Sequence, residues 1–450
     1  MGTLWSKGVQ ATQLVDEFTV SNDRVLDMRL AKHDVMGSKA HIKMLCSIGL
    51  LEKEEEEILQ KGLDEILEEI ERGEFKLGDD VEDIHSQVEF LLTKRFGEIG
   101  KKIHSGRSRN DQVLVDLKLF LREEVEIFRD EIVELFNTLQ QLSEKYKNVL
   151  LPGYTHAQIA MPSSFGMWFG AYAEALVDDM HMLKGAYNVV NQNPLGSAAG
   201  YGSSFPLDRD MTTSLLGFKT LNYNSVAAQL SRGKSEKAVA GALGQLALTL
   251  NKFAADCCMY MCPNFGFISF PDEFTTGSSI MPHKKNPDVF ELIRAHANRI
   301  CALPDTIRHI TTNLPVGYFR DMQLIKEVYF PLFDQLNDLL KITNYAVENM
   351  EMKADIMSNP LYAPAFSVEE VNRRATNGVP FRDAYRQVAD EITQGTFRHE
   401  ATLEETLAHY THEGSIGNLC NEQIKEKMET IVQTISIDRV HQAIHKLLNH

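Results

Sequence analysis

The chain has 450 residues, a formal net charge of −17 and a sequence pI near 5.4. This acidic excess argues against nucleic acid or an anionic membrane as the main partner. We expect neither a transmembrane span nor a secretory signal, because no apolar run is long enough. The length predicts two or three folding units, and the six cysteines, which lack metal-ligand spacing, are expected to be reduced thiols in a cytoplasmic protein.

Helical periodicity begins near Leu26 and continues through most of the chain, whereas residues 1–25 are predicted to form an arm. The long predicted helices are Gln112–Tyr146, Ser163–Val190, Ala227–Met261, Pro287–Thr312 and Asp321–Met350. Helices of this length, joined by loops rich in Gly, Pro and Ser, predict an all-α protein built on a long-helix bundle. The segments shorten after Ser358-Asn359-Pro360, which predicts a small C-terminal helical domain.

The predicted domains are residues 1–106, an N-terminal helical domain with an arm, 107–354, the central bundle, and 355–450, the small C-terminal domain. Bundle helices rich in Ala, Leu and Val would leave apolar faces uncovered in a monomer. We therefore expect a homo-oligomer formed by helix–helix packing.

The first of three unusual polar loops lies at residues 104–112, just before a long predicted helix. It carries Arg107, Ser108, Arg109 and Asn110. Helix N-termini favour negative charge, so this loop is a candidate anion site. Helix capping by Ser108 or Asn110 is the simpler alternative, but it does not account for two arginines.

The second loop, residues 152–158, places Thr155 and His156 before another long helix. A histidine among small polar residues can serve as a general acid or base, although a structural histidine is the alternative. The third loop, residues 277–286, carries two hydroxyl groups, a Met-Pro elbow, two lysines and an asparagine. Together the three loops supply a base, an acid and anion-holding groups, which an elimination beside a carboxylate requires.

Several runs carry a family resemblance. The third loop, GSSIMPHKKN, resembles the shared motif of the fumarase/aspartase superfamily. The branch is narrowed by SGRSRNDQV, PGYTHAQ, DVMGSKAH at residues 34–41 and EDIH at residues 82–85. These runs resemble the argininosuccinate lyase branch from about Gly37 to Arg382. The resemblance implies a homotetramer of three-domain helical subunits with a twenty-helix core, active sites built from three chains, and no metal, nucleotide or redox cofactor.

The resemblance also implies roles for particular residues in the elimination of argininosuccinate to arginine and fumarate. It makes Ser278 the base, His156 the acid that protonates the leaving nitrogen, and Lys284 and Asn286 the donors to an aci-carboxylate carbanion. The serine and histidine roles could be exchanged. The remaining expected site residues tune the histidine or bind substrate: Glu291 in the first role, and Thr155, Ser108, Arg109, Asn110, His85, Tyr318, Gln323 and Lys326 in the second.

The chain departs from the family pattern at several positions. Ser6-Lys7-Gly8 replaces a Gly-Gly-Arg-Phe run, and Asp23 stands where the family has a substrate-contacting serine. Phe319-Arg320 replaces Asn-Lys, and the loop at residues 193–207 is reordered. These changes affect the expected substrate contacts more than the elimination.

Two alternatives to an argininosuccinate-cleaving enzyme remain at this stage. One is another lyase of the superfamily that acts on a different succinyl adduct. The other is a catalytically silent structural homologue resembling the lens crystallins. Two further motifs were set aside: Arg232–Ser235 lacks the strand and glycine of a phosphate-binding loop, and His409–Glu413 lacks metalloprotease spacing.

Overall fold

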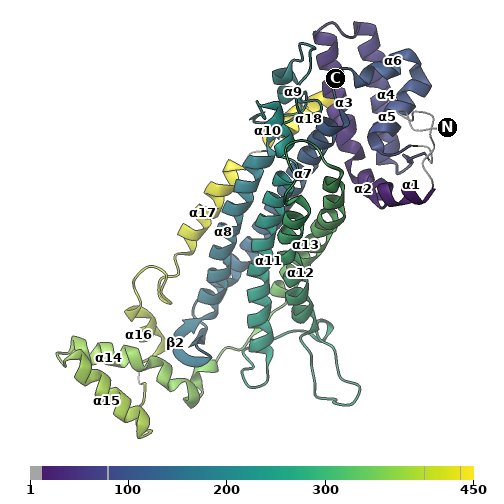
Figure 1. Cartoon of the computed structure of the whole chain (residues 1–450). Helices are drawn as coiled ribbons and strands as arrows, with labels where there is room; N and C mark the ends of the chain where they lie inside the picture. The colour runs from purple at the N-terminus through teal and green to yellow at the C-terminus, as the bar shows by residue number, and fades with distance from the viewer. Residues whose placement is uncertain (1–12, 79–80, 400, 436, 450) are drawn as a thin grey trace.

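The computed structural model describes residues 13–78, 81–399, 401–435 and 437–449. It is an elongated all-α molecule in which an N-terminal helical region and a small C-terminal region lie at opposite ends of a helical bundle (Figure 1). The departure at Ser6-Lys7-Gly8 lies outside the described residues. None of the helices in those described ranges has the length and apolar character needed to span a membrane.

The N-terminal region is made of short and medium helices around α3, whose residues are mostly buried. The described part of the predicted arm, residues 13–25, contains one helix and most of a second. The elements of this region are α1 (Gln13–Val20), α2 (Asp23–Asp27), η1 (Met28–Leu30), α3 (Ala31–Ser47), α4 (Lys53–Glu71), α5 (Ile84–Phe96), α6 (Glu98–Lys101) and η2 (Lys102–His104).

Long helices form the bundle, and their bounds lie within a few residues of the prediction in most cases. They are α7 (Arg109–Lys145), α8 (Phe165–Val190), α11 (Lys234–Met261), α12 (Asp288–Thr311) and α13 (Ile325–Glu348). The shorter helices that join them are α9 (Arg209–Leu215), α10 (Ser225–Leu230), η3 (Asp272–Phe274) and η4 (Arg320–Leu324). The bundle helices alternate in direction, so successive connections lie at opposite ends (Figure 1).

Two predicted long helices are interrupted at their beginnings. The range Ala227–Met261 is split because Gly233 has φ of 76°, a left-handed conformation that separates α10 from α11. The range Asp321–Met350 begins as the 3₁₀ helix η4 and becomes α-helical only at Ile325. Both interruptions lie at the end of the bundle that carries Arg109.

The loop containing His156 is more regular than the sequence analysis indicated. It is an antiparallel hairpin of β1 (Leu150–Thr155) and β2 (Gln158–Ser164). Hereafter these two strands are called the hairpin, and the bundle end that carries it is the hairpin end. The remaining strands are two-residue pieces: β3 (Gln192–Asn193) pairs with β4 (Thr220–Leu221), and β5 (Ile268–Ser269) with β6 (Glu351–Met352).

The bundle core is apolar and contains a cluster of aromatic rings at the hairpin end. Trp168 of α8 stacks on Phe253 of α11, with ring centroids 5.2 Å apart. The indole of Trp168 and the hydroxyl of Tyr172 both donate to Asp256. Each such buried aromatic side chain contributes roughly 1.5–3 kcal/mol, so this cluster fixes the end of the bundle on which the hairpin rests.

The C-terminal segment, residues 355–450, packs in two places. Its first elements stand apart from the bundle beside the hairpin, but α17 and α18 return along it, packing on α8 and on α3 (Figure 1). The elements are η5 (Ile356–Ser358), η6 (Pro360–Phe366), α14 (Ser367–Thr376), α15 (Phe381–Thr393), α16 (Leu403–His409), α17 (Asn421–Thr434) and α18 (Asp438–Leu448).

Candidate active site

A cavity of about 190 Å³ lies where the N-terminal region meets the bundle. We call it the Arg109 cavity. Among its lining residues are six that the sequence singled out as substrate contacts, namely His85, Arg109, Asn110, Tyr318, Gln323 and Lys326. The fold therefore gathers residues from α5, α7 and the segment around η4 into one place, although His85 and Lys326 are 241 positions apart in the sequence.

Ser108 and Arg109 open α7 beside this cavity. Ser108 is the N-cap, and it forms a capping box with Asp111, whose side chain accepts from the Ser108 backbone N–H at 2.8 Å. The guanidinium of Arg109 lies 3.1 Å from carboxylate oxygens of both Glu82 and Asp83. Ser108 therefore caps the helix, as the simpler alternative expected. Arg109, the next residue of the same loop, lines the cavity proposed as the anion site.

Asn110 lines the cavity from the first turn of α7. Within the described ranges its side-chain amide makes no hydrogen bond. The phenol of Tyr318, which is 42 % exposed, lines the same cavity and also lacks one there. These two groups can thus donate to a ligand without giving up a contact inside the protein.

His85 is buried behind these groups. Its Nδ1 lies 2.8 Å from Asp34 Oδ1 and 3.4 Å from Asp116 Oδ2. Burial alone would lower the pKa of His85, but Asp34, together with Asp83 and Asp116, raises it to about 9. The imidazole is therefore a cation at neutral pH, and its buried Nε2 has no hydrogen-bond partner among the described residues.

Asp34, His85 and Asp116 are also the cluster that could hold a metal ion, since one ligand atom from each lies within 4.8 Å of the others. Ligation needs the neutral imidazole, so a metal ion would have to displace the proton that the carboxylates hold on His85. The short contact between Nδ1 and Asp34 fits an imidazolium–carboxylate pair. In this cluster the carboxylates of Asp34 and Asp116 stabilise the positive charge of His85 behind the cavity.

Gln323 and Lys326 are engaged inside the protein, which the sequence did not indicate. The amide of Gln323 donates to the backbone carbonyl of Thr19, at the end of α1, at 2.9 Å. The Lys326 ammonium lies 2.5 Å from carboxylate oxygens of both Asp23 and Asp27 in α2. These two residues therefore fasten the N-terminal helices over the cavity.

Arg232 is a cavity residue that the sequence analysis missed as a binding group. It is 6 % exposed and donates to the Met322 carbonyl at 3.1 Å. Its Nε lies 3.2 Å from Glu236, while its NH1 has no hydrogen-bond partner among the described residues. The available signal was an arginine directly before a long helix, the same signal that identified Arg109.

Thr155 and His156 lie at the tip of the hairpin, at the other end of the bundle. Both are exposed, and His156 and Ala157 have φ of 53° and 59°. Positive φ at both central residues is the turn usually made by Asn-Gly, and it costs roughly 1–3 kcal/mol for each ordinary residue. Such strain is concentrated at functional positions, and His156 is an exposed residue in this turn.

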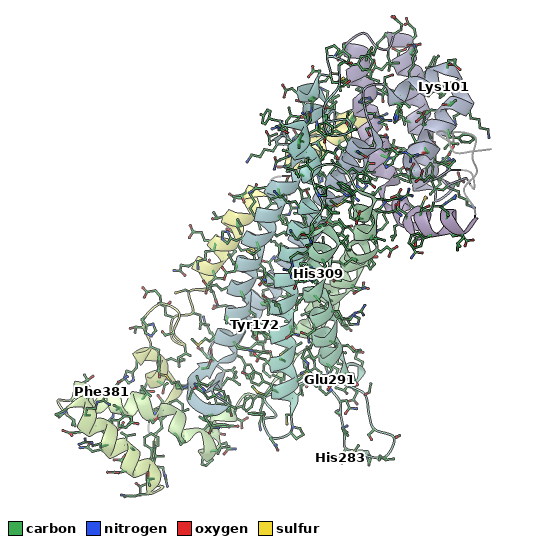
Figure 2. All side chains as sticks on the ribbon, in the orientation of Figure 1. Lys101, Tyr172, His283, Glu291, His309 and Phe381 are labelled. Carbon is green, nitrogen blue, oxygen red and sulfur yellow. The ribbon has the colours of Figure 1, made fainter. Side chains whose placement is uncertain are left out.

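The Ser278 loop, residues 275–287, projects from the same end. Figure 2 shows His283 at its tip, away from the bundle, and Glu291 near the start of α12. The Ser278 hydroxyl oxygen accepts from the backbone N–H groups of Ile280 at 3.3 Å and Met281 at 3.2 Å. Two amide donors stabilise negative charge on this oxygen, which makes the hydroxyl more acidic.

The two lysines of this loop differ in their surroundings. Lys285 pairs with Asp272, whereas the exposed ammonium of Lys284 has no ion pair or hydrogen bond within the described residues. Asn286 closes the base of the loop, because its backbone N–H donates to Thr276 O at 2.9 Å. Its side-chain amide donates to the Thr276 hydroxyl at 3.3 Å.

The two groups of residues are far apart within one chain. Arg109 begins α7 and the hairpin follows its end, and a helix of 37 residues is ~55 Å long. Over the described ranges, no hydrogen bond or ion pair joins the hairpin tip to the Ser278 loop, or Glu291 to His156. The predicted tuning of His156 by Glu291 therefore remains a prediction, for a site that more than one chain would build.

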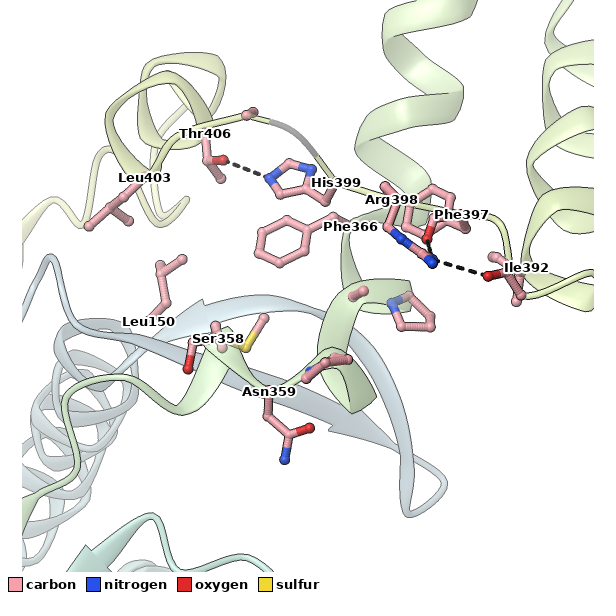
Figure 3. Close-up of a pocket in the computed structure, with 16 residues that line it drawn as sticks. Leu150, Ser358, Asn359, Phe366, Ile392, Phe397, Arg398, His399, Leu403 and Thr406 are labelled. Carbon is pink, nitrogen blue, oxygen red and sulfur yellow. Dashed lines mark hydrogen bonds between the residues drawn. The ribbon is translucent and has the colours of Figure 1, made fainter.

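A larger cavity of about 720 Å³ lies between the hairpin and the C-terminal helices (Figure 3). It contains none of the predicted site residues. His399 is stacked on Phe366 and bonded to Thr406, and Arg398 donates to backbone carbonyl groups. Its main polar groups are thus already satisfied, and we assign no chemistry to it.

Known proteins are similar to this chain in sequence. A family model described as a lyase matches residues 6–302. The argininosuccinate lyase of Bacteroides thetaiotaomicron is 56 % identical over 445 residues, which cover 99 % of each chain. That of Thermotoga neapolitana is 38 % identical over 388 residues, which cover 86 % of this chain and 98 % of that one.

Solved structures match in fold. An EDDS lyase in complex with formate has a TM-score of 0.74 at 20 % identity, covering 98 % of this chain and 94 % of that one. A class II fumarase from Schistosoma mansoni has a TM-score of 0.69 at 16 % identity, covering 90 % and 91 %. The resemblance and the all-α fold predicted from the sequence are confirmed. The chain is a lyase and belongs to the argininosuccinate lyase family.

Proposed function

We propose that this chain cleaves argininosuccinate to L-arginine and fumarate by proton abstraction beside a succinyl carboxylate, followed by loss of the guanidino group. Family membership supports the overall reaction. The observation that carries the proposed chemistry is the Ser278 hydroxyl, whose oxygen accepts from two backbone amides.

Ser278 is the proposed base. A serine abstracts a proton only as its alkoxide, and the N–H groups of Ile280 and Met281 would stabilise the negative charge of that form once the hydroxyl proton has been lost to solvent. The abstracted proton leaves a carbanion whose charge is delocalised onto the neighbouring carboxylate. Closure of the loop over the substrate would exclude water and strengthen each of these interactions.

Lys284 and Asn286 are the proposed donors to the doubly charged aci-carboxylate. The unpaired ammonium of Lys284 is free to reach a substrate. Asn286 is held at the loop base by Thr276, which orients its amide. Donors fixed before the charge develops contribute most to the rate, because they need no reorganisation during the reaction.

His156 is the proposed acid for the departing nitrogen, with Thr155 beside it at the hairpin tip. The strained turn exposes this imidazole, which suits a group that must reach a site on another chain. Glu291 would then orient His156 across an interface between chains. The exchanged assignment, with His156 as base and Ser278 as acid, uses the same geometry and is separated by the kinetic test below.

The Arg109 cavity is the proposed substrate-binding part of the site. His85, Arg109 and Asn110 would hold carboxylates, with Ser108 presenting the N-terminus of α7. Tyr318 would bind a polar end of the substrate directly. Gln323 and Lys326, which already hold α1 and α2, would act through the position of those helices as well as by contact.

We propose that the active unit is a homotetramer that shares its sites between chains. The ~55 Å length of α7 separates the two groups of residues in one chain, so other copies must supply the hairpin and the Ser278 loop. Every long bundle helix also exposes a large apolar side chain, as expected for helices that pack against other copies. These side chains include Ile127, Met182, Leu248, Leu292 and Tyr345.

The proposal extends to the surroundings of the protein. All six cysteines are free, which supports a cytoplasmic location, where thiols stay reduced. The net charge of −17 supports a protein without a nucleic-acid partner. The domain division is proposed in the form 1–106, 107–354 and 355–450, with α17 and α18 packed back on the first two parts.

The direct test is fumarate release, followed by its ultraviolet absorbance, from argininosuccinate, adenylosuccinate, aspartate and malate in parallel. We expect release from argininosuccinate alone, and a fall in turnover of at least about 10² in Ser278→Ala, because the base is lost. Exchange of the substrate proton with solvent distinguishes the roles: it should vanish in Ser278→Ala and persist in His156→Asn. Absence of fumarate from every substrate in a folded protein would instead indicate a silent homologue.

A further inference from the structure

The Arg109 cavity has walls of both charges. Its carboxylates come from Asp23, Asp27, Glu82 and Asp83, and its cations from His85, Arg109, Arg232, Arg320 and Lys326. A ligand that carried only carboxylates would find partners among the cations but none among the acidic side chains. The walls suit a ligand with a positive and a negative group close together.

Most of the acidic groups are already neutralised by neighbours. Glu82 lies 3.1 Å from Arg109 and 3.0 Å from Arg320, and Asp83 lies 3.1 Å from Arg109. Both carboxylates therefore have full counter-charges on the cavity wall, and neither needs a cation from a ligand.

The pair formed by Asp23 and Asp27 is different. A single ammonium, that of Lys326, lies between them at 2.5 Å from each. The next nearest cation, Arg232, is itself paired with Glu236 at 3.2 Å. Among the residues that the structure describes, two carboxylates share one ammonium here, which leaves one negative charge without its own ion pair.

Exposure indicates which carboxylate faces the ligand. The side chain of Asp27 is 3 % exposed, whereas that of Asp23 is 17 % exposed. Burial, and then repulsion from Asp27, raise the pKa of Asp23 to about 6. The protein thus holds this carboxylate in a position where a ligand cation would stabilise it.

We propose that Asp23 binds the α-ammonium group of the arginine portion of the substrate. This inference rests on the proposed function and adds a specificity contact to it. An α-amino acid end carries an ammonium beside a carboxylate, which matches the mixed charge of the cavity wall. Asp23 acts as a specificity residue, because the ammonium lies remote from the bond that breaks.

Asp23 could instead serve only to anchor α2 through Lys326. The two roles predict different responses to the ligand. A contact with the ammonium affects only ligands that carry it, whereas an anchor affects every ligand of the cavity in the same way. A pair of ligands that differ only in the α-amino group therefore separates them.

The experiment uses the whole protein with L-arginine and 5-guanidinopentanoate, which lacks the amino group, and measures binding by calorimetry. The wild type should bind L-arginine roughly 10- to 100-fold more tightly, as expected for a hydrogen bond between charged groups. Asp23→Asn should lose most of this preference by weakening L-arginine alone. Asp23→Ser should do the same, and thermal unfolding checks that both variants fold.

Asp321→Asn is the matched control, since it removes an exposed carboxylate from η4 that does not line the cavity. It should change neither affinity. Equal weakening of both ligands in Asp23→Asn, or a wild type that does not distinguish them, would overturn the inference. Fumarate release from argininosuccinate is measured separately, so a failure of the proposed reaction is recognised independently of the binding result.

Discussion

At the residue scale, some polar groups of the proposed site have an ion-pair partner within the described part of the chain and others have none. Lys284 and Lys285 are adjacent in sequence, but Asp272 neutralises only Lys285. Sequence reasoning named Lys284 as a donor from the family resemblance, and it gave no physical reason to prefer Lys284 to Lys285. Their difference depends on the packing of η3 beside the Ser278 loop, which no short motif encodes.

Replacing these lysines one at a time tests that difference. Lys284→Ala should lower kcat by about 10²–10³, the usual effect of removing one preorganised donor. Lys285→Ala should keep nearly normal turnover, because its charge is already used by Asp272. Steady-state fumarate release measures both, and similar losses in the two variants would contradict the assigned role of Lys284.

His41 gives a prediction about stability. It is fully buried, and its Nε2 lies 2.8 Å from the carbonyl of Ser105, next to the loop that opens α7. Burial and then the charge of Arg107 lower its pKa to about 3. Unfolding releases it to a pKa near 6.5, so between pH 3 and 6.5 the unfolded chain binds the extra proton.

The free energy of unfolding should therefore fall as the pH drops from 6.5 toward 3. His41 should account for about 1.4 kcal/mol of this fall for each pH unit. In His41→Gln this part of the slope should be lost, although the variant is less stable at neutral pH. His181→Gln, an exposed histidine of α8, should keep the wild-type slope. Urea unfolding at several pH values measures all three, and an unchanged slope in His41→Gln would be the contrary outcome.

The kinds of site residue could be predicted from the sequence better than their partners. Asn110 and Tyr318, which the sequence singled out as substrate contacts, both line the Arg109 cavity. The ion pairs of Lys326 were not predictable, because they depend on how α2 packs against α13. Arg232 was missed since its loop was judged only as a phosphate-binding motif.

At the scale of elements, hydrophobic periodicity located the long helices and failed at the hairpin. The helix predicted over Gln112–Tyr146 is α7, Arg109–Lys145. In the hairpin, Pro152 pairs with Pro162, and proline is depleted in strands, so propensity argued against this assignment. The turn residues His156 and Ala157 also lack the Asn-Gly signature of a tight hairpin.

The junction between the hairpin and α8 gives an element-scale prediction. A Cβ on Gly166 would lie 2.6 Å from the Ser143 carbonyl oxygen and 2.5 Å from the Lys147 Cα. Because these are backbone atoms, Gly166→Ala should destabilise the protein by roughly 1–3 kcal/mol and displace the hairpin. Measurements should show a lower turnover number and a lower unfolding temperature in this variant.

Gly185 is the control in the same helix, since a Cβ there would meet nothing within 4 Å. Gly185→Ala should stabilise the protein by about 0.5–1 kcal/mol through a better helix propensity. Equal effects of the two substitutions would show that the close approach at Gly166 is unimportant.

At the scale of the whole molecule, the proposed sites need more than one chain. This could be anticipated from family resemblance, but not from periodicity, which says nothing of where loops from different copies meet. Periodicity also failed to show how the C-terminal segment packs on the rest of the chain. Its short helices predicted a separate domain, but α17 and α18 use their apolar faces to pack on the bundle and on α3.

Mixing two inactive variants tests the sharing of sites. Asn110→Ala damages the Arg109 cavity, and Lys284→Ala damages the Ser278 loop. Mixed oligomers should contain sites with both parts intact, roughly a quarter of the total if chains from different copies combine at random. Activity should therefore reappear after dissociation and reassembly.

The matching control mixes Lys284→Ala with Ser278→Ala. Both changes lie in one loop, so no combination of chains restores it, and the mixture should remain inactive. If the first mixture also stayed inactive while forming normal oligomers, each chain would have to contain a complete site.

The length of α7 sets a constraint on sequence change. An insertion of seven residues would move its two ends apart by ~10 Å. Arg109 at one end and the hairpin at the other would then miss their counterparts on neighbouring copies, even if the longer helix folded well. The number of residues between Arg109 and His156 thus sets the distance between the two groups of site residues. The other bundle helices must have lengths that match this distance. Insertions should be tolerated in the C-terminal loops long before they are tolerated in these helices.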